Sequence, residues 1–152
     1  MTTLAERLRG RRVGVAFAAG YFGFYHHAGV LRALAEAGVR PARVTGTSAG
    51  ALVAGLWAAG LEPERVVDEL LAVRRADFWD PQPPFTRLGF GLLAGRALAA
   101  RLAAILPVHG FDDCRAPAAF GAYDLATGRV RHLGSGALVP ALAASLAYPY
   151  LF

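Results

Sequence analysis

The sequence contains no lysine and only one cysteine, Cys114, among its 152 residues. A lone cysteine excludes a disulfide framework and favours a cytosolic location. All 16 basic residues are arginines, and with 11 acidic residues they give a net charge of +5. The arginines are scattered and do not alternate with aromatic residues, so we predict a solvated surface and no nucleic-acid partner. Weak attraction to an anionic lipid surface is the second interpretation.

Charge of either sign is scarce, because charged residues make up only 18% of the chain. Three nearly uncharged stretches, residues 13–30, 44–61 and 133–152, approach the length of a membrane-spanning helix. Glycines, histidines and turn-forming residues interrupt them, so we predict buried segments of an α/β core instead. The charged N-terminus is not typical of a signal peptide. The length suits one domain over residues 1–152.

Short apolar runs alternate with helical patterns along the chain. Strands are predicted at residues 11–18 and 41–46, and each is followed by a helix, at 24–37 and at 51–60. This order is typical of a parallel sheet with right-handed crossovers, so we predict an α/β fold with helices on both faces of the sheet. The remaining segments are predicted to be helices at 62–75, 92–106 and 136–148, a loop or lid at 76–91 and a hairpin at 119–133.

Ser48 lies between two glycines in "GTSAG", after the second predicted strand and before a helix. In a nucleophile elbow, small residues such as Gly46 and Gly50 flank the serine because the backbone there is strained and crowded. The turn also places the amide of Ala49 at a helix N-terminus, where it can stabilise an oxyanion. We therefore interpret Ser48 as a nucleophile, with a structural turn serine as the alternative.

A second small-residue loop, "AAGYFG" at residues 18–23, follows the first strand and opens the first helix. Its spacing is that of a dinucleotide-binding fingerprint with the first glycine replaced by alanine. The second strand ends in the Ser48 turn and not in an acid that would hold a ribose, so a nucleotide-binding half-domain is the lesser alternative. The other use of such a loop is as an oxyanion hole beside Ser48.

Taken together, this loop, "GVLRALAEAG" and "GTSAGALVAGLWAAG" resemble the patatin-like phospholipases. "YDLATGRV" and "ALVPALAASLAYPYLF" are similar to later segments of that family, so the resemblance covers nearly the whole chain. It implies a patatin-like parallel sheet flanked by helices and hydrolysis of lipid acyl esters by a serine–aspartate dyad. The residues that it implies are Ser48 as nucleophile and the amides of Ala19, Gly20, Tyr21 and Ala49 as oxyanion hole. No cluster has metal-ligand spacing, so no metal or cofactor is predicted.

The sequence departs from the family at two places. Ala18 and Ala19 replace loop glycines, and Phe22 stands where many members have a basic residue. The dyad aspartate of the family belongs to an Asp-Gly motif, but no Asp-Gly dipeptide occurs in this sequence. We therefore expect an incomplete domain whose C-terminal strands and dyad aspartate lie beyond Phe152. A catalytically inactive lipid-binding protein is the alternative.

Other polar residues are given structural roles. Asp124 is predicted to cap the hairpin turn, and His27, which matches a family histidine, is predicted to be structural, with a general-base role as the lesser alternative. The expected partners are a lipid substrate and, peripherally, a membrane surface. Exposed strand edges and apolar faces of an incomplete domain also predict self-association.

Overall fold

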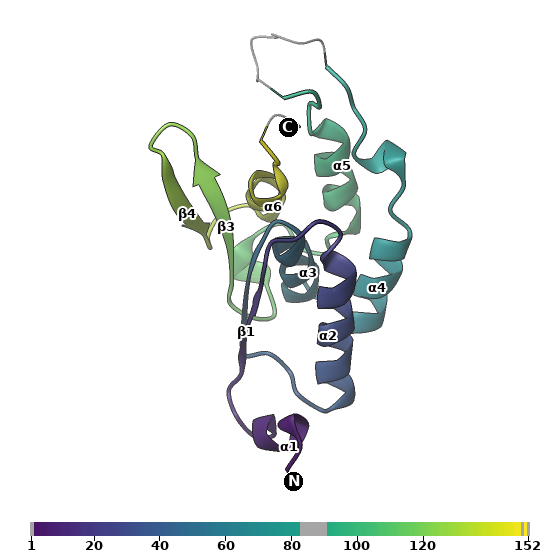
Figure 1. Ribbon diagram of the computed structural model, residues 1–152, viewed down its shortest axis with the longest axis vertical. Coiled ribbons are helices and arrows are strands. Elements are labelled where there is room, and N and C mark those ends of the chain that lie inside the picture. The colour runs from purple at the N-terminus through teal and green to yellow at the C-terminus, as the bar shows by residue number, and fades with distance from the viewer. Residues whose placement is uncertain (1, 83–90, 150, 152) are drawn as a thin grey trace.

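The computed structural model describes residues 2–82, 91–149 and 151, which form a sheet covered by helices (Figure 1). The element order alternates between strands and helices in the first half of the chain, as the apolar pattern predicts. The elements are α1 (Leu4–Leu8), β1 (Gly14–Phe17), α2 (Phe24–Glu36), β2 (Arg43–Thr47), α3 (Ala49–Ala58), α4 (Pro63–Leu71), α5 (Arg96–Ile105), β3 (Ala118–Asp124), β4 (Arg129–Leu133) and α6 (Leu138–Leu146), with 3-10 turns η1 (Arg75–Asp77) and η2 (Phe111–Asp113).

The four described strands form one sheet in the order β1-β2-β3-β4. β1, β2 and β3 are parallel, and β4 pairs antiparallel with β3 as the predicted hairpin. Gly128, with φ +65°, lies in the hairpin turn, and Asp124 Oδ1 accepts hydrogen bonds from the amides of Ala126 (3.0 Å) and Thr127 (3.2 Å). The predicted structural role of Asp124 is therefore confirmed.

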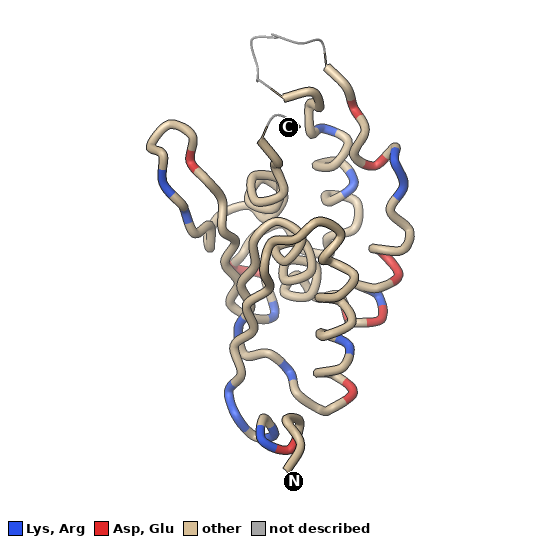
Figure 2. Tube along the Cα trace, viewed as in Figure 1, with Lys and Arg blue, Asp and Glu red and all other residues tan. Residues whose placement is uncertain are grey.

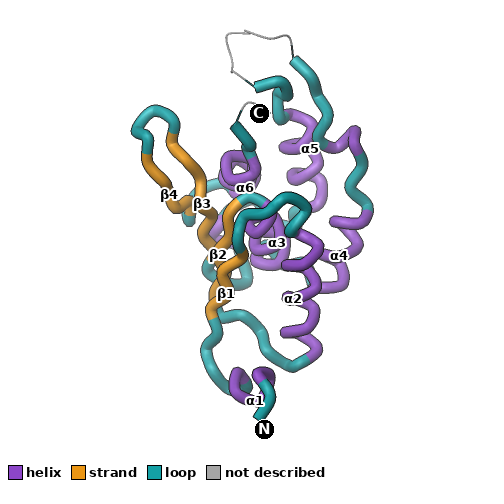
Figure 3. Tube along the Cα trace, in the orientation of Figure 1, coloured by secondary structure: helices purple, strands orange, loops and turns teal. Residues whose placement is uncertain are grey.

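The helices that cover the sheet lie on one of its faces (Figures 1 and 3). In β2, buried Val44 and Gly46 alternate with exposed Arg43, Thr45 and Thr47, so the described residues leave the other face uncovered. Our prediction of helices on both faces is wrong for this part of the chain. The strands are added in one direction across the sheet, and successive right-handed crossovers in one direction return over the same face.

Helix α3 is the centre of the core, and every one of its residues except Leu52 is buried. A Cβ on Gly55 would lie only 2.7 Å from the Leu142 side chain of α6 and 3.2 Å from that of Phe120 in β3. Glycine therefore allows α6 and the sheet to approach α3 closely. Burial on all sides explains why this segment has no polar face. Within the described ranges, no helix has both the length and the hydropathy needed to cross a bilayer.

Helix α5 begins later than the predicted start at residue 92. Gly95 has φ +73°, and the Leu93 amide donates to the Leu151 carbonyl over 2.7 Å, so this part of the chain is not helical. The carboxylate of Asp80 accepts hydrogen bonds from the amides of Gly95 and Ala97, both 3.0 Å, and so caps α5. Part of the predicted lid, residues 83–90, lies outside the described residues.

Candidate active site

Ser48 occupies the turn between the end of β2 and the start of α3. Its backbone has φ 53° and ψ −121°, and among the described residues only Phe22 is another non-glycine residue with positive φ. Such a conformation costs about 1–3 kcal/mol and persists only where the surrounding structure enforces it. A strained serine between a parallel strand and a helix N-terminus is the geometry of a nucleophile elbow.

The two glycines that flank Ser48 lie where the backbone of the elbow is most crowded. A Cβ on Gly46 would clash with the backbone of Gly50 and Ala51, and a Cβ on Gly50 would clash with the carbonyls of Phe17 and Ala18. The first turn of α3 therefore lies directly against β2 and against the end of β1. This contact also brings the loop that follows β1 beside the elbow.

Ser145 of α6 holds the elbow from the other side. Its buried hydroxyl accepts the amide hydrogen of Ser48 over 2.9 Å and donates to the carbonyl of Gly121 in β3 over 2.6 Å. One side chain thus ties α6, β3 and the elbow together. No role was predicted for Ser145 from the sequence, although a lone polar residue in an apolar stretch is a signal of a buried hydrogen bond.

The loop at residues 18–23 is fixed by its own backbone and by His27. The Gly23 amide donates to the Gly20 carbonyl over 3.0 Å. His27 Nε2 lies 2.8 Å from the Ala18 carbonyl, and since a carbonyl only accepts, Nε2 carries the proton. The His27 ring also packs against Phe17, with ring centroids 5.2 Å apart. These contacts support the structural role predicted for His27.

The four amides named for the oxyanion hole have no hydrogen-bond acceptor among the described residues; they belong to Ala19, Gly20, Tyr21 and Ala49. Ala49 is the first residue of α3, and an amide at that position has no partner inside its own helix. Unpaired backbone donors beside a strained serine can bind a developing negative charge. The arrangement is consistent with the predicted oxyanion hole, which stays a prediction.

Carboxylates within the described part of the chain are not hydrogen-bonded to the Ser48 hydroxyl. The carboxylate of Asp124 is held in the hairpin turn, where the hydrogen bonds from Thr127 lower its pKa from the ordinary value. For Asp80, burial raises the pKa, but hydrogen bonds from the backbone of Ala97 and Gly95 outweigh that effect and lower it. Both aspartates therefore have structural partners of their own.

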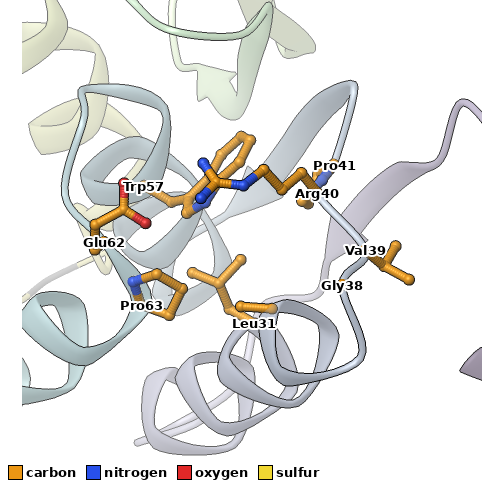
Figure 4. Close-up of a pocket in the computed structure, with 9 residues that line it drawn as sticks. Leu31, Gly38, Val39, Arg40, Pro41, Trp57, Glu62 and Pro63 are labelled. Atoms are coloured by element: carbon orange, nitrogen blue, oxygen red, sulfur yellow. The ribbon is translucent and has the colours of Figure 1, made fainter.

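A cavity of about 130 Å³ lies between α2, α3 and α4 (Figure 4), away from Ser48. Trp57, Arg40 and Glu62 are among the residues that line it. Trp57 follows Ser48 by nine positions, which corresponds to about 13 Å along the axis of α3. The cavity is therefore at the opposite end of the helix and takes no part in the candidate active site.

The mostly parallel sheet and its covering helices define an α/β protein, with Ser48 in a strained turn between a strand and a helix. A family model described as patatin-like phospholipase matches residues 15–152, and the chain belongs to this family. The family and the α/β fold that the sequence predicts are thus confirmed. Membership of this family argues against the nucleotide-binding half-domain that was the lesser alternative for the loop at residues 18–23.

Two curated fungal proteins are similar to this chain. Lysophospholipase nte1 of Neurospora crassa is 38% identical over 78 residues, which is 50% of this chain and 5% of the fungal protein. Lysophospholipase nte1 of Emericella nidulans is 47% identical over 55 residues, which is 36% of this chain and 4% of that protein. The matched region is thus a small part of each relative.

Proposed function

We propose that this protein is a lipid acyl hydrolase whose nucleophile is Ser48. The observation that carries the proposal is the strained backbone of Ser48, at φ 53°, between β2 and the N-terminus of α3. In this mechanism Ser48 Oγ loses its proton to a base and attacks the ester carbonyl carbon. The leaving alkoxide takes up a proton and departs, and water then hydrolyses the acyl-enzyme to a free fatty acid.

The oxyanion of each tetrahedral intermediate is proposed to accept hydrogen bonds from the loop and from α3. The donors are the amides of Ala19, Gly20, Tyr21 and Ala49, which have no acceptor among the described residues. The amide of Ser48 is not proposed as a donor, because it is already bonded to Ser145 Oγ. Donors fixed before the reaction need no reorganisation as charge develops, and each one contributes about 10²–10³ in kcat.

The base is proposed to be an aspartate that follows Phe152 in the complete protein. The family resemblance supports this position, since the sequence contains no Asp-Gly dipeptide. The hydrogen-bond partners of Asp80 and Asp124 support it too, because they give both carboxylates structural roles. We propose that residues 1–152 form part of a single patatin-like domain. Sequencing the gene beyond the Phe152 codon tests this step: an Asp-Gly codon pair soon afterwards supports the dyad, and a stop codon contradicts it.

The proposed substrates are lipid esters of carboxylic acids. The family supports this class, and the names of the fungal relatives make lysophospholipids the first substrates to test. The lone Cys114 supports a cytosolic location, and the proposed substrates imply contact with lipid surfaces from that side.

A fluorophosphonate probe, which labels activated serines, tests Ser48 directly. The sequence has three serines, at positions 48, 135 and 145, so the labelled residue is easily assigned. We expect labelling of the complete protein, with the proposed aspartate that follows Phe152, to disappear in Ser48→Ala and to persist in Ser135→Ala, because Ser135 is exposed in a loop after β4. If this complete protein is folded and resists the probe, the result contradicts the hydrolase proposal and favours the non-catalytic lipid-binding alternative.

A further inference from the structure

Five aromatic rings form a continuous row beside the candidate active site. The ring centroids are separated by 6.0 Å (Tyr148 to Tyr21), 5.7 Å (Tyr21 to Phe22), 5.9 Å (Phe22 to Phe24) and 4.4 Å (Phe24 to Tyr25). We call these five residues the aromatic row. Four of them are largely exposed: Tyr21 (78%), Phe22 (65%), Tyr148 (57%) and Tyr25 (44%). A contiguous patch of exposed apolar side chains marks an interaction surface, whereas single exposed apolar residues are common on any protein.

The aromatic row stands on segments without formal charge. Residues 13–31 and 132–152 contain no Arg, Lys, Asp or Glu. Figure 2 shows the result: charges lie on α1, the C-terminal part of α2, α4, α5 and the hairpin, whereas the loop before α2 and the whole of α6 carry none. A surface without charges loses little solvation when it leaves water, which favours contact with an apolar partner.

Phe22 combines an exposed ring with a strained backbone. Phe22 has φ +54°, a region that bulky residues seldom adopt. The loop nevertheless places its ring in solvent and not in the core. Such strain is typical of functional segments. Burial of the ring does not offset the cost of this backbone conformation, because Phe22 is 65% exposed.

The aromatic row is continuous with the elbow. Tyr21 follows Ala18 by three residues, and the Ala18 carbonyl lies against the backbone of Gly50 in the first turn of α3. Tyr148 follows Ser145 by three residues, and Ser145 is bonded to the Ser48 amide. A partner that covers the aromatic row would therefore lie at the entrance to Ser48.

We propose that the aromatic row inserts into the surface of a lipid aggregate and delivers acyl esters from it to Ser48. This inference rests on the proposed function, because it makes the lipid surface the source of the substrate. Tyrosine combines an apolar ring with a polar hydroxyl, and aromatic residues concentrate at membrane–water interfaces for that reason. Exposed arginines support the same partner. Arg129 and Arg131 belong to β4 and Arg96 to α5, and these two elements lie on either side of α6 in Figure 1. Arginines on such elements suit lipid phosphates.

Binding of the full chain to phosphatidylcholine vesicles tests this proposal without any chemistry. The variant is Phe22→Gly, which removes the ring and leaves a residue that accepts positive φ. The matched control is Leu4→Ala, because Leu4 is 68% exposed and lies on α1 at the opposite end of the molecule (Figure 1). Co-sedimentation is measured at 0.1 M and at about 0.5 M salt. Attraction between arginines and phosphates weakens at the higher concentration, because salt shortens the Debye length below its value of about 10 Å at 0.1 M, whereas insertion of apolar rings does not weaken.

We expect Phe22→Gly to weaken vesicle binding about tenfold at both salt concentrations, and Leu4→Ala to bind as the wild type does. A second variant, Tyr148→Ser, is expected to weaken binding in the same way. Equal binding by Phe22→Gly and wild type would overturn the proposal. The proposal would also be overturned if Phe22→Gly formed fewer dimers in analytical ultracentrifugation but bound vesicles as the wild type does. The aromatic row would then contact a second copy of the chain. Fluorophosphonate labelling in the absence of lipid reports on Ser48 alone, so the two proposals can fail separately.

Discussion

The elbow at Ser48 and the loop at residues 18–23 lie side by side, but they are built in opposite ways. At the elbow, Gly46 and Gly50 have backbone atoms where a Cβ would be, and the turn is closed in by β1 and by α6. In the loop, the nearest heavy atom to a Cβ on Gly20 is 3.9 Å away, and the flanking residues are exposed.

This difference shows that two glycine-containing turns can have different physical reasons for their glycines. The elbow needs glycine because the surrounding backbone leaves no room, so its conformation is dictated by packing. The loop has room for a side chain at Gly20, and it carries a positive φ at Phe22 where no glycine stands. Its shape depends instead on a few hydrogen bonds, of which the contact from His27 to Ala18 is one.

The largest effect is expected from Gly50→Ala. The added methyl group would clash with the carbonyls of Phe17 and Ala18, and relief requires moving α3 away from β1. We expect a loss of about 3 kcal/mol in the free energy of unfolding, measured by urea denaturation.

Two other substitutions calibrate this result. Gly20→Ala is expected to change stability by no more than about 0.5 kcal/mol. Gly29→Ala, in an exposed helical position with nothing within 4 Å, is expected to stabilise the protein by about 0.5–1 kcal/mol. If Gly50→Ala and Gly20→Ala lowered the free energy of unfolding equally, the contrast between the elbow and the loop would be wrong.

The next largest effect is expected from Ser145→Ala. The variant leaves the Ser48 amide without its acceptor and the Gly121 carbonyl without one of its donors. We expect a loss of about 1–3 kcal/mol in stability, because a group that stays buried without a partner costs that much. The rate of fluorophosphonate labelling, measured where both proteins are fully folded, should also fall as the Ser48 backbone relaxes. Ser135→Ala serves as the control, and unchanged stability in Ser145→Ala would show that the hydroxyl does not hold the elbow.

A smaller effect on stability is expected from His27→Ala, which removes the hydrogen bond to the Ala18 carbonyl. The loss should be about 1 kcal/mol, the contribution of a typical hydrogen bond. Labelling of Ser48 should slow several-fold, since the proposed oxyanion donors at Ala19, Gly20 and Tyr21 follow directly. His27→Gln retains a donor and should recover part of the rate. The neighbouring His26 is exposed, so His26→Ala should match the wild type, and an equal fall there would argue against the role of His27.

The smallest effect concerns the pH dependence of the hairpin turn. Hydrogen bonds from Thr127 lower the pKa of Asp124 in the folded protein, so the carboxylate stabilises the turn at pH values above its ordinary pKa of about 3.9. This stabilisation is lost as the pH falls through the lowered pKa. Amide chemical shifts of Ala126 and Thr127 should report the transition, which Asp124→Ala should lack. The melting temperature near neutral pH should hardly change in that variant, because the turn is exposed.

Local patterns were sufficient to predict the parallel strands, the turn at Ser48 and the hairpin. Each of these depends on neighbouring residues: apolar runs, small residues around a serine, and Asp124 four positions before Gly128. The structure agrees with them closely, since β2 ends at Thr47 and α3 begins at Ala49. The family resemblance was carried by the same short segments.

Contacts between distant residues were not predictable in this way. Ser145 and Ser48 are 97 positions apart, and nothing near either residue indicates the other. The late start of α5 depends likewise on Asp80 and on the pairing of Leu93 with Leu151. The positive φ of Phe22 contradicts the preference of its residue type, so only the structure reveals it. Coverage of a single sheet face follows from strand order, which the sequence does not specify.

Strand order in this sheet is the same as strand order along the chain, β1-β2-β3-β4. During translation, each strand therefore emerges after the strand with which it pairs. β1, β2 and the complete turn at Ser48 are synthesised about 70 residues before β3 begins at Ala118, and domains begin to fold as their N-terminal parts leave the ribosome. Among the four described strands, the sheet grows at one edge only, and no later strand enters between two that are already paired.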